Sequence, residues 1–524
     1  MTTIDRGEQP TGVRQVSVAA LEETLQGKDS ELIFDLLISN ARQLASTGQG
    51  QQLIKMAPYM GDESSSGLAI RRGFVMLGHL VDLEYATAEA LANELIIEEK
   101  NNPVYDFLQK ITSYVFAVSA FAQGDLARAK QSISDALDAP IITSDLGAAD
   151  KVNLIRMRSA ILMLESDGVS LESELNLATK ITDESNELDF GVHLMAIKAM
   201  LLFENGEFLK SAELAKSVIT SSQVHGYTGI TSSLDCQYAL ARCHVSFGKL
   251  EEAIELLEEI KIEAKKYDMH VWFVSAESVI IRILAELSRI RESLDRTVEL
   301  RKYISQFPKP YDLSWIADVA ELYVRYRLGD LNRAKEIAAR APEIYYVKQI
   351  IETMESDKGK EFSKEQVMQL PEETQRQKLW KYLYLSEFPA SKDFSPKKYM
   401  KMALEVGERT GFRDIFLRQG NTHQNLIFEI AREEPSVFLE ELSRDCIKRA
   451  NLRKQFDNLG NESLTSRELQ VLKQLATGKS ISQIGKELHI SQNTMKTHLR
   501  NIYRKMSVDG RKSAVEKAQG NYLI

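Results

Sequence analysis

A six-residue pattern recurs along this chain of 524 residues at nearly regular intervals. Each copy has Gly, a polar residue, Leu or Phe, two further residues, and then Ala or Ser. Weaker turns at residues 167–168 and 289–291 complete a series spaced by about 44, 38, 42, 41 and 40 residues. A period of this length is typical of stacked helix hairpins, and it constrains the fold more than any other feature. The clear copies begin at Gly124, Gly206, Gly248 and Gly329.

The residue types of this pattern suit a turn between two packed helices. Gly after a first helix can adopt the left-handed conformation without steric cost, and the next polar residue can cap the second helix. The small residue five positions later lets the helices approach closely. A second small residue lies seven positions before the Gly in three copies, at Ala117, Ala199 and Ala241, whereas Leu322 takes this place in the last copy. Turns at residues 48–50 and 83–85 extend the array upstream.

Composition agrees with a soluble helical protein. Only 11 residues are Pro, 44% are hydrophobic and 27% are charged, which excludes collagen-like, mucin-like and disordered classes. The longest apolar run, near residues 114–122, is about half of the roughly 18 residues that a membrane span needs. The first residues lack the apolar stretch of a signal peptide, and three Cys cannot form a disulfide framework. We therefore expect a cytoplasmic protein without membrane contact.

Charge is distributed unevenly along the chain. Residues 463–524 contain eleven basic and four acidic residues, a net charge of +7. The rest therefore carries −16, since the whole chain has a net charge of −9. An acidic body with a compact basic end suggests a polyanionic partner for that end. The alternative from charge alone is a solvated tail without a partner.

The basic end has the sequence features of a small helical module. Capping boxes at Thr465 with Glu468 and at Ser480 with Gln483 predict the first two helix starts, and Ser491 predicts the third. Gly478 is expected to end the first helix region. A fourth helix is expected at about residues 509–519. Each of the first three helices has an apolar stripe for a common core, formed by Leu469, Val471, Leu472 and Leu475, then Ile481, Ile484 and Leu488, then Met495, Leu499, Ile502 and Met506.

The third helix carries polar residues opposite its apolar stripe. Two short helices joined by a tight turn in a basic module fit a helix-turn-helix, whose second helix enters the major groove of DNA. Arg, Lys, Asn and Gln can pair with base edges there. A small helical bundle with a solvated polar face is the alternative interpretation. The candidate base contacts are Gln492, Asn493, Lys496, Thr497 and Arg500.

About 60 residues of this module resemble the LuxR-type DNA-binding domain of bacterial regulators. The resemblance implies base contacts from Lys496, Thr497 and Arg500, and a dimer contact through the fourth helix. The sequence departs from the usual family residues at four positions: Met495 stands in place of Val, Met506 in place of Leu, Ile481 in place of Asn and Gly485 in place of Ala. The resemblance also implies phosphate contacts from Lys479, Ser480, Thr494 and His498. The residues that match the pattern are Leu464, Thr465, Arg467, Glu468, Val471, Leu472, Ala476, Gly478, Ser480, Ile484, Leu488, Ile490, Ser491, Thr494, Lys496, His498, Ile502, Lys505, Val508, Arg511 and Ala514.

The body resembles tetratricopeptide repeats, in the longer-period form of large bacterial regulators. Residues 44–61 and 402–420 are similar to segments that flank the repeats of maltose-activator-like regulators. Those relatives carry an N-terminal nucleotide-switch domain, but this sequence contains no Gly-x-x-x-x-Gly-Lys-Ser/Thr phosphate loop. A phospho-receiver domain and an acyl-homoserine-lactone sensor are not supported, because no strand pattern appears. We therefore expect no enzymatic activity, no catalytic residues and no cofactor.

Two other features are weaker candidates for chemistry. Cys236, Cys243 and His244 lie on one expected helix, where a metal or redox site competes with the favoured interpretation of buried structural Cys. No metal site is therefore expected. The aromatic stretch at residues 307–311 with Trp315 is either a ligand surface or, as we favour, a stiff loop between repeats.

These patterns predict an all-α chain with four parts. An N-terminal arm (1–30) precedes a tetratricopeptide-like superhelical repeat array (31–440), a linker (441–462) and a four-helix LuxR-type domain (463–524). The predicted function is that of a transcriptional regulator that binds a two-fold related site on double-stranded DNA as a homodimer. Its repeats would sense a protein, peptide or small molecule, and RNA polymerase is a further candidate partner. The alternative is a repeat scaffold or anti-regulator whose basic module binds DNA only nonspecifically.

Overall fold

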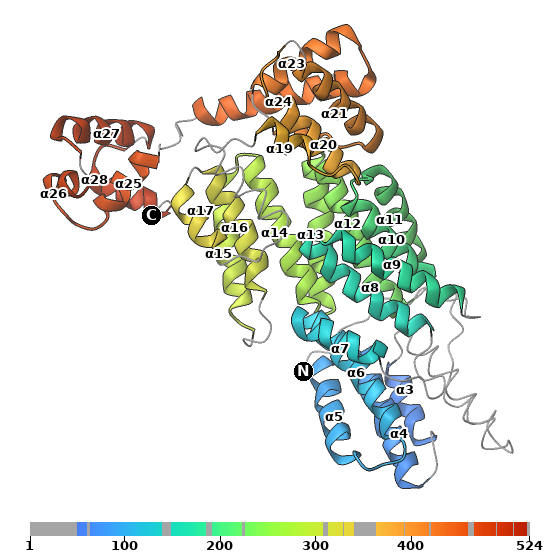
Figure 1. Cartoon of the computed structure of the whole chain (residues 1–524). Helices are drawn as coiled ribbons and strands as arrows, with labels where there is room; N and C mark the ends of the chain where they lie inside the picture. The colour runs from blue at the N-terminus through green and yellow to red at the C-terminus, as the bar shows by residue number, and fades with distance from the viewer. Residues whose placement is uncertain are drawn as a thin grey trace. The chain divides into compact units, whose positions relative to one another are not determined.

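The computed structural model contains helices and no strand in the part of the chain that it describes, so the predicted all-α fold is confirmed (Figure 1). One isolated bridge joins Ser391 and Phe394. The expected N-terminal arm lies outside the described residues. These are residues 50–59, 63–138, 148–184, 191–222, 226–307, 313–328, 330–339, 363–391, 394–418, 421–458, 466–488, 490–506 and 508–520.

The described helices form a tetratricopeptide-like array, a second group of helices and a C-terminal four-helix module. Contacts divide it into two compact units, residues 1–243, 259–273 and 309–312, and residues 244–258, 274–308 and 313–524. The array contains α3 (Gly50–Met56), the 3-10 helix η1 (Ala57–Tyr59), α4 (Ser65–Val81), α5 (Tyr85–Glu98), α6 (Tyr105–Gln123), α7 (Leu126–Asp138), α8 (Ala148–Glu165), α9 (Gly168–Asp183), α10 (Gly191–Glu204), α11 (Phe208–Ser222), α12 (Gly226–Ser246), α13 (Leu250–Lys266), α14 (His270–Glu286), α15 (Ile290–Ile304), α16 (Ser314–Arg327) and α17 (Leu331–Ala338).

The expected hairpin turns have left-handed backbone at their key residue. Gly124, Gly206 and Gly248 have φ of 89°, 82° and 77°, as the recurring pattern predicts. At the weaker turns the same conformation falls on Ser166 and Ser288, with φ of 58° and 60°. A side chain at such a backbone angle costs free energy, so these two turns depend on the packing of the helices around them. The Gly329 of the last copy lies outside the described residues.

The small residues of the pattern lie where paired helices meet. Ala129 and Ala253 are fully buried at the position five residues after the turn Gly. Ser211 takes this place after Gly206, and its Oγ donates a 2.8 Å hydrogen bond to the carbonyl of Ala199 in the preceding helix. The position seven residues before the Gly therefore contacts the position five residues after it, as the sequence pattern implies.

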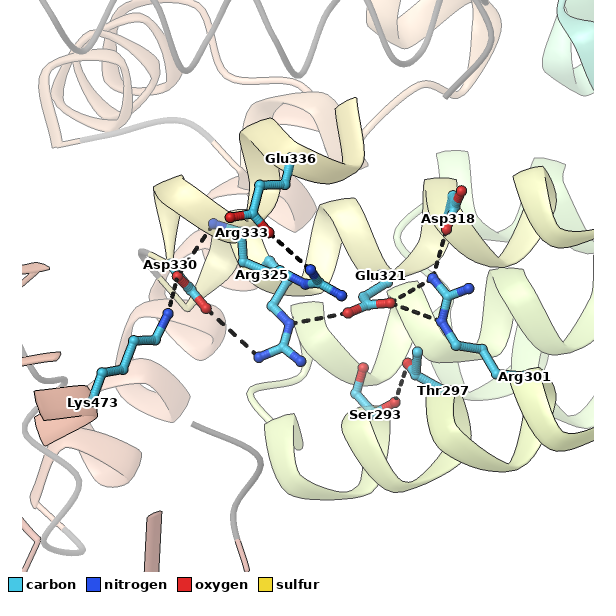
Figure 2. Close-up of polar contacts among 10 residues, drawn as sticks. All are labelled: Ser293, Thr297, Arg301, Asp318, Glu321, Arg325, Asp330, Arg333, Glu336 and Lys473. Carbon is cyan, nitrogen blue, oxygen red and sulfur yellow. Dashed lines mark hydrogen bonds and ion pairs between the residues drawn. The ribbon is translucent and has the colours of Figure 1, made fainter. Parts of the chain in front are cut away.

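The second unit contains a chain of ion pairs around α16 (Figure 2). Arg301 on α15 bridges Asp318 and Glu321, with Nη2 2.6 Å from Asp318 Oδ1. Glu321 also pairs with Arg325, whose Nη1 lies 3.7 Å from Asp330 Oδ2 at the start of α17. Charged side chains thus connect α15, α16 and α17, and Arg301 and Arg325 compensate three largely buried carboxylates.

A second group of helices follows the array within the second unit. Their buried core includes Phe416, Met400 and Leu442. Asp414, which begins α22, is buried and accepts a 2.9 Å hydrogen bond from Arg449 Nη1 on α24. Burial alone would raise the pKa of Asp414, but Arg418 and Arg449 outweigh it, so the pKa lies below its ordinary value. These helices are α19 (Lys364–Met368), α20 (Gln375–Leu385), α21 (Pro396–Thr410), α22 (Asp414–Leu417), α23 (Asn421–Glu433) and α24 (Val437–Asn458).

The predicted linker, residues 441–462, overlaps with α24. Residues up to Asn458 are helical, and Leu442 and Cys446 are buried against the preceding helices. Residues 459–465 lie outside the described part. The boundaries of the four expected parts stay predictions, but much of the segment assigned as linker is packed helix.

None of the described helices is both long and apolar enough to cross a membrane.

Candidate nucleic-acid interface

The C-terminal module folds from four helices around one core. These are α25 (Ser466–Leu475), α26 (Ile481–Glu487), α27 (Gln492–Lys505) and α28 (Arg511–Gly520), and Figure 1 shows them in red. Gly478 has φ of 78° between α25 and α26, as expected of a turn Gly. The core consists of Val471, Leu472, Leu475, Ile484, Met495, Leu499, Ile502, Met506, Ala514 and Ala518.

Two of the three predicted helix starts are described, and both are confirmed. Ser480 caps α26, and a reciprocal bond with Gln483 completes the capping box. Ser491 caps α27 by accepting a 3.2 Å hydrogen bond from the Thr494 amide. Thr465 of the first expected box lies outside the described residues. The caps fix where α26 and α27 begin, and therefore which side chains α27 presents.

One expected core residue is placed wrongly by the sequence pattern. Ile481 is 43% exposed, whereas Ile484 is fully buried. Ile481 is the first residue of α26, directly after the Ser480 cap, and it lies outside the module core. The apolar stripe of α26 therefore begins at Ile484, and the side chain at Ile481 is available at the surface.

Helix α27 has one buried and one exposed face. Met495, Leu499 and Ile502 have exposed fractions of 1%, 7% and 0% and hold the helix on the core. The candidate base contacts all lie on the other side and are exposed. Among the described residues, neither Lys496 nor Arg500 has an ion-pair partner, so both charges are available to an incoming ligand. The exposed candidates are Gln492, Asn493, Lys496, Thr497 and Arg500.

The candidate phosphate contacts are less uniform. Thr494 is exposed at the start of α27, whereas His498 is half-buried. Ser480 uses its hydroxyl for the α26 cap. Lys479 Nζ lies 2.7 Å from Glu487 Oε2, with both side chains more than two-fifths exposed. Screening by solvent makes such a pair weak, so a phosphate can replace Glu487 as the partner of Lys479.

Buried polar contacts lock α27 and α28 onto α25. Lys505 Nζ lies 2.7 Å from Glu468 Oε2, with exposed fractions of 12% and 3% for the two side chains. Arg511 donates through Nε and Nη2 to the carbonyl of Leu475, at 3.0 and 2.7 Å. Lys505 and Arg511 belong to the matched LuxR-type pattern, but the sequence alone did not assign these contacts. They tie the C-terminal end of α27 and the start of α28 to α25.

Arg504 was not among the residues selected from the sequence. It is exposed on α27, four residues after Arg500 and eight after Lys496. Since residues three or four apart share a helix face, Arg504 extends the basic stripe of α27 toward its C-terminal end. The helical period of basic residues could have identified it.

The weaker candidates do not assemble a metal site. Cys236, Cys243 and Cys446 are all buried and unbonded to another Cys. In the part of the chain that the structure describes, no three His, Cys, Asp or Glu side chains gather in a way that could hold a metal ion. Trp315 is half-buried on α16, and residues 308–311 of the aromatic stretch lie outside the described part.

Residues 462–518 match the model of the luxR family of bacterial regulatory proteins. This range includes α25, α26 and α27 and most of α28, so the module is a LuxR-type helix-turn-helix domain. The match covers the C-terminal module and not the array.

Several curated proteins are similar to parts of this chain. The HTH-type transcriptional regulator MalT of Vibrio cholerae is 24% identical over 369 residues, which cover 65% of this chain and 38% of that protein. The nitrate/nitrite response regulator protein homolog of Haemophilus influenzae is 40% identical over 90 residues, 16% of this chain and 43% of the relative. The transcriptional regulatory protein LiaR of Bacillus subtilis is 43% identical over 76 residues, 14% and 36% of the two chains. The chain thus spans about two fifths of the length of these relatives.

Among solved structures, a Rap protein complexed with Competence and Sporulation Factor is similar to this chain. The match covers 81% of this chain and 100% of the solved chain, at 12% sequence identity and a TM-score of 0.43.

Proposed function

We propose that this chain is a transcriptional regulator that binds double-stranded DNA through α27. The observation that carries the proposal is the exposed face of α27 in a LuxR-type domain. There Lys496 and Arg500 lie opposite the buried Met495, Leu499 and Ile502. A helix of this kind fits the major groove, where Arg and Lys donate to guanine and Asn and Gln pair with adenine.

The assigned contacts fall into two groups. Lys496, Thr497 and Arg500, with Gln492 and Asn493, read base edges and determine sequence preference. Lys479, Ser480, Thr494 and His498 contact phosphates, which supply affinity without sequence information. The module has a net charge of +7, which favours approach to a polyanion.

The proposed complex is a homodimer on a two-fold related DNA site, with α28 at the contact between the two modules. The helical array is the sensor, and its signal is a protein, a peptide or a small molecule. RNA polymerase is a further candidate partner of the chain. Arrays of this type offer extended surfaces for binding. The proposal contains no catalytic step, and the place of action is the cytoplasm, where the DNA is found.

Selection of bound sequences from random duplex DNA tests the proposal, followed by footprinting on the enriched site. The full chain should enrich a palindromic sequence. Lys496→Ala and Arg500→Ala should each weaken binding to that site by about 1–3 kcal/mol and relax the preference at one base position. The fold should be unchanged, because both side chains are exposed.

Lys486→Ala is the matched control. Lys486 is exposed on α26, is not among the assigned base or phosphate contacts, and its replacement removes the same charge from the same module. It should preserve sequence preference. If both α27 variants keep the wild-type preference, α27 is not the recognition helix. Binding without any enriched sequence would instead favour the scaffold or anti-regulator function, in which the module binds DNA only nonspecifically.

A further inference from the structure

Thr497 lies in the middle of the exposed face of α27. Its own side chain is exposed, with Lys496 directly before it in the chain. Asn493 lies four residues before it and Arg500 three residues after it, so both share its helix face. Thr497 has the shortest side chain of the five candidate base contacts. It can therefore contact a base only where the backbone of α27 itself lies close to the base edges.

The hydroxyl of Thr497 is engaged within its own helix. Oγ1 donates a 3.1 Å hydrogen bond to the main-chain carbonyl of Asn493, one turn earlier. Thr has only one hydroxyl proton, and this bond uses it, so no donor is left for the carbonyl oxygen of guanine or thymine. Because the side chain is exposed while its hydroxyl is bound to the helix, the Cγ2 methyl group is available to a ligand.

The four bases differ in what they offer to a methyl group. In the major groove only thymine carries a methyl group, at position 5 of its ring, and this group projects from the base edge toward the protein. Contact between two methyl groups removes apolar surface from water and is favourable. A polar base edge opposite a methyl group would instead lose water without gaining a hydrogen bond, which costs free energy. Thymine is therefore the base that suits the exposed group of Thr497.

We propose that Thr497 recognises thymine through contact between its Cγ2 methyl group and the 5-methyl group of the base. The proposal rests on the proposed DNA-binding function and names the base that one residue of α27 selects. The bond from Oγ1 to the Asn493 carbonyl has a supporting part, because it favours one rotamer of Thr497 and so presents the methyl group in a fixed position.

Helix geometry places this thymine within the DNA site. Thr497 and Arg500 are separated by about 4.5 Å along the axis of α27, and Thr497 and Lys496 by about 1.5 Å. Successive bases of one DNA strand are about 3.4 Å apart. The thymine should therefore lie within about two base pairs of the positions that Lys496 and Arg500 read, where guanine is the preferred base.

The oxygen of Thr497 offers the competing mode of recognition. Oγ1 keeps acceptor capacity, so it could accept a hydrogen bond from the amino group of adenine or cytosine. Thr497→Ser keeps the hydroxyl and removes the methyl group, whereas Thr497→Val keeps a methyl group and removes the oxygen. The two variants separate the modes with little change in size, at a position where the side chain is exposed and supports no core packing.

The test uses the full chain and the DNA site that is enriched from random duplexes. In a panel of duplexes, each thymine in turn is replaced by deoxyuridine in both half-sites, which removes only the 5-methyl group and leaves the base pair intact. Fluorescence anisotropy of labelled duplexes measures the affinity of each.

Thr477→Ser is the matched control for the loss of a methyl group. Thr477 is exposed in the same module, between α25 and α26, and its Oγ1 likewise donates to a main-chain carbonyl, that of Gln474, at 2.7 Å. It is not among the assigned base or phosphate contacts, so the control removes the same group from a similar environment outside α27.

For wild type and control, replacement of one particular thymine should lower affinity by about fourfold per half-site, the effect of one methyl group that is no longer buried. Thr497→Ser should bind the thymine and deoxyuridine duplexes equally at that position. Thr497→Val should discriminate between them as wild type does.

Three outcomes would overturn the proposal: no thymine of the enriched site responds to replacement, Thr497→Ser keeps the wild-type discrimination, or Thr497→Val loses it. In each of these cases an enriched site exists, so the proposed function stands. If no sequence is enriched at all, the proposed function fails, and the assignment of Thr497 fails with it.

Discussion

Ser211 Oγ donates a 2.8 Å hydrogen bond to the main-chain carbonyl of Ala199 across the hairpin of α10 and α11. The same relationship recurs between Ser293 and Ile281 in the second unit, also at 2.8 Å. In both hairpins a buried hydroxyl occupies the position that Ala129 and Ala253 fill in other hairpins. We therefore expect the size of this residue to matter more for the stability of the hairpin than its polarity.

Substitutions at Ser211 can separate size from hydrogen bonding. Ser211→Ala should destabilise the α10–α11 hairpin by about 1 kcal/mol or less, because one neutral hydrogen bond is lost and the packing remains. Ser211→Leu should cost about 1–3 kcal/mol or more, since Ser211 is fully buried and has no room for extra atoms. Hydrogen exchange of the α10 and α11 amides measures both effects. An equal loss of protection in the two variants would contradict the assigned close contact.

Glu468 and Lys505 should hold the recognition helix in place. Glu468→Ala leaves the largely buried Lys505 ammonium without its 2.7 Å partner. We expect a loss of about 2–3 kcal/mol, below the 3–5 kcal/mol of a fully buried pair because Lys505 keeps some exposure. Faster hydrogen exchange in α25 and α27, together with weaker DNA binding, would report it. Glu468→Met/Lys505→Leu should recover most of the protection, and a double variant as unstable as Glu468→Ala would count against this explanation.

Lys479 should act through phosphates only. Lys479→Ala should weaken DNA binding to a similar degree on all sequences and reduce the slope of log K against log salt concentration by about 0.9. Removal of its weak partner by Glu487→Gln should have the opposite effect and strengthen binding, because Lys479 then has no competing carboxylate. Affinity measured at several salt concentrations tests both variants. A change in the preferred sequence for Lys479→Ala would show that the residue reads bases.

Asp235 should make the stability of the first unit decrease as pH rises from about 4 to about 6. Burial raises the pKa of this carboxyl to about 6, and Arg156 opposes the shift only in part. An acid whose pKa is raised by folding binds its proton more tightly in the folded state than in the unfolded state. Protonated Asp235 therefore contributes fully to the free energy of unfolding below the unfolded pKa of about 3.9, and this contribution is lost as pH rises through about 6.

The comparison of wild type with Arg156→Met/Asp235→Leu isolates this contribution. The difference between their unfolding free energies should change between about pH 4 and pH 6 and stay constant from pH 7 to 8. Thermal unfolding in matched buffers provides the measurement. A difference that does not vary between pH 4 and 6 would mean that Asp235 keeps an ordinary pKa in the folded chain.

Local sequence patterns were sufficient to predict the hairpin turns of the array and most helices of the C-terminal module. The turn conformation at Gly124 and the cap at Ser480 involve neighbours a few residues apart, so residue type and spacing determine them. The buried stripe of α27 is similarly periodic. Ile481 was misplaced because the first residue of a short helix has few helical neighbours to define its face.

Contacts between distant residues could not be read from the sequence. Arg156 and Asp235 are 79 residues apart, and no local period relates them. Glu468 and Lys505 are 37 residues apart and meet only after α25 and α27 pack. Both pairs lie among charged residues that look ordinary in the sequence, so tertiary packing alone reveals that they are buried.

Helix α24 has a mechanical consequence for the chain. Its 22 residues extend about 33 Å, and buried Arg449 fastens its middle to Asp414. A flexible connection would let the preceding helices move without disturbing the C-terminal module. Because α24 is a continuous helix that is held near its centre, a small tilt of α22 would instead move the end of α24 at Asn458 by a larger distance. The helices before α24 can therefore change the position of the residues after it.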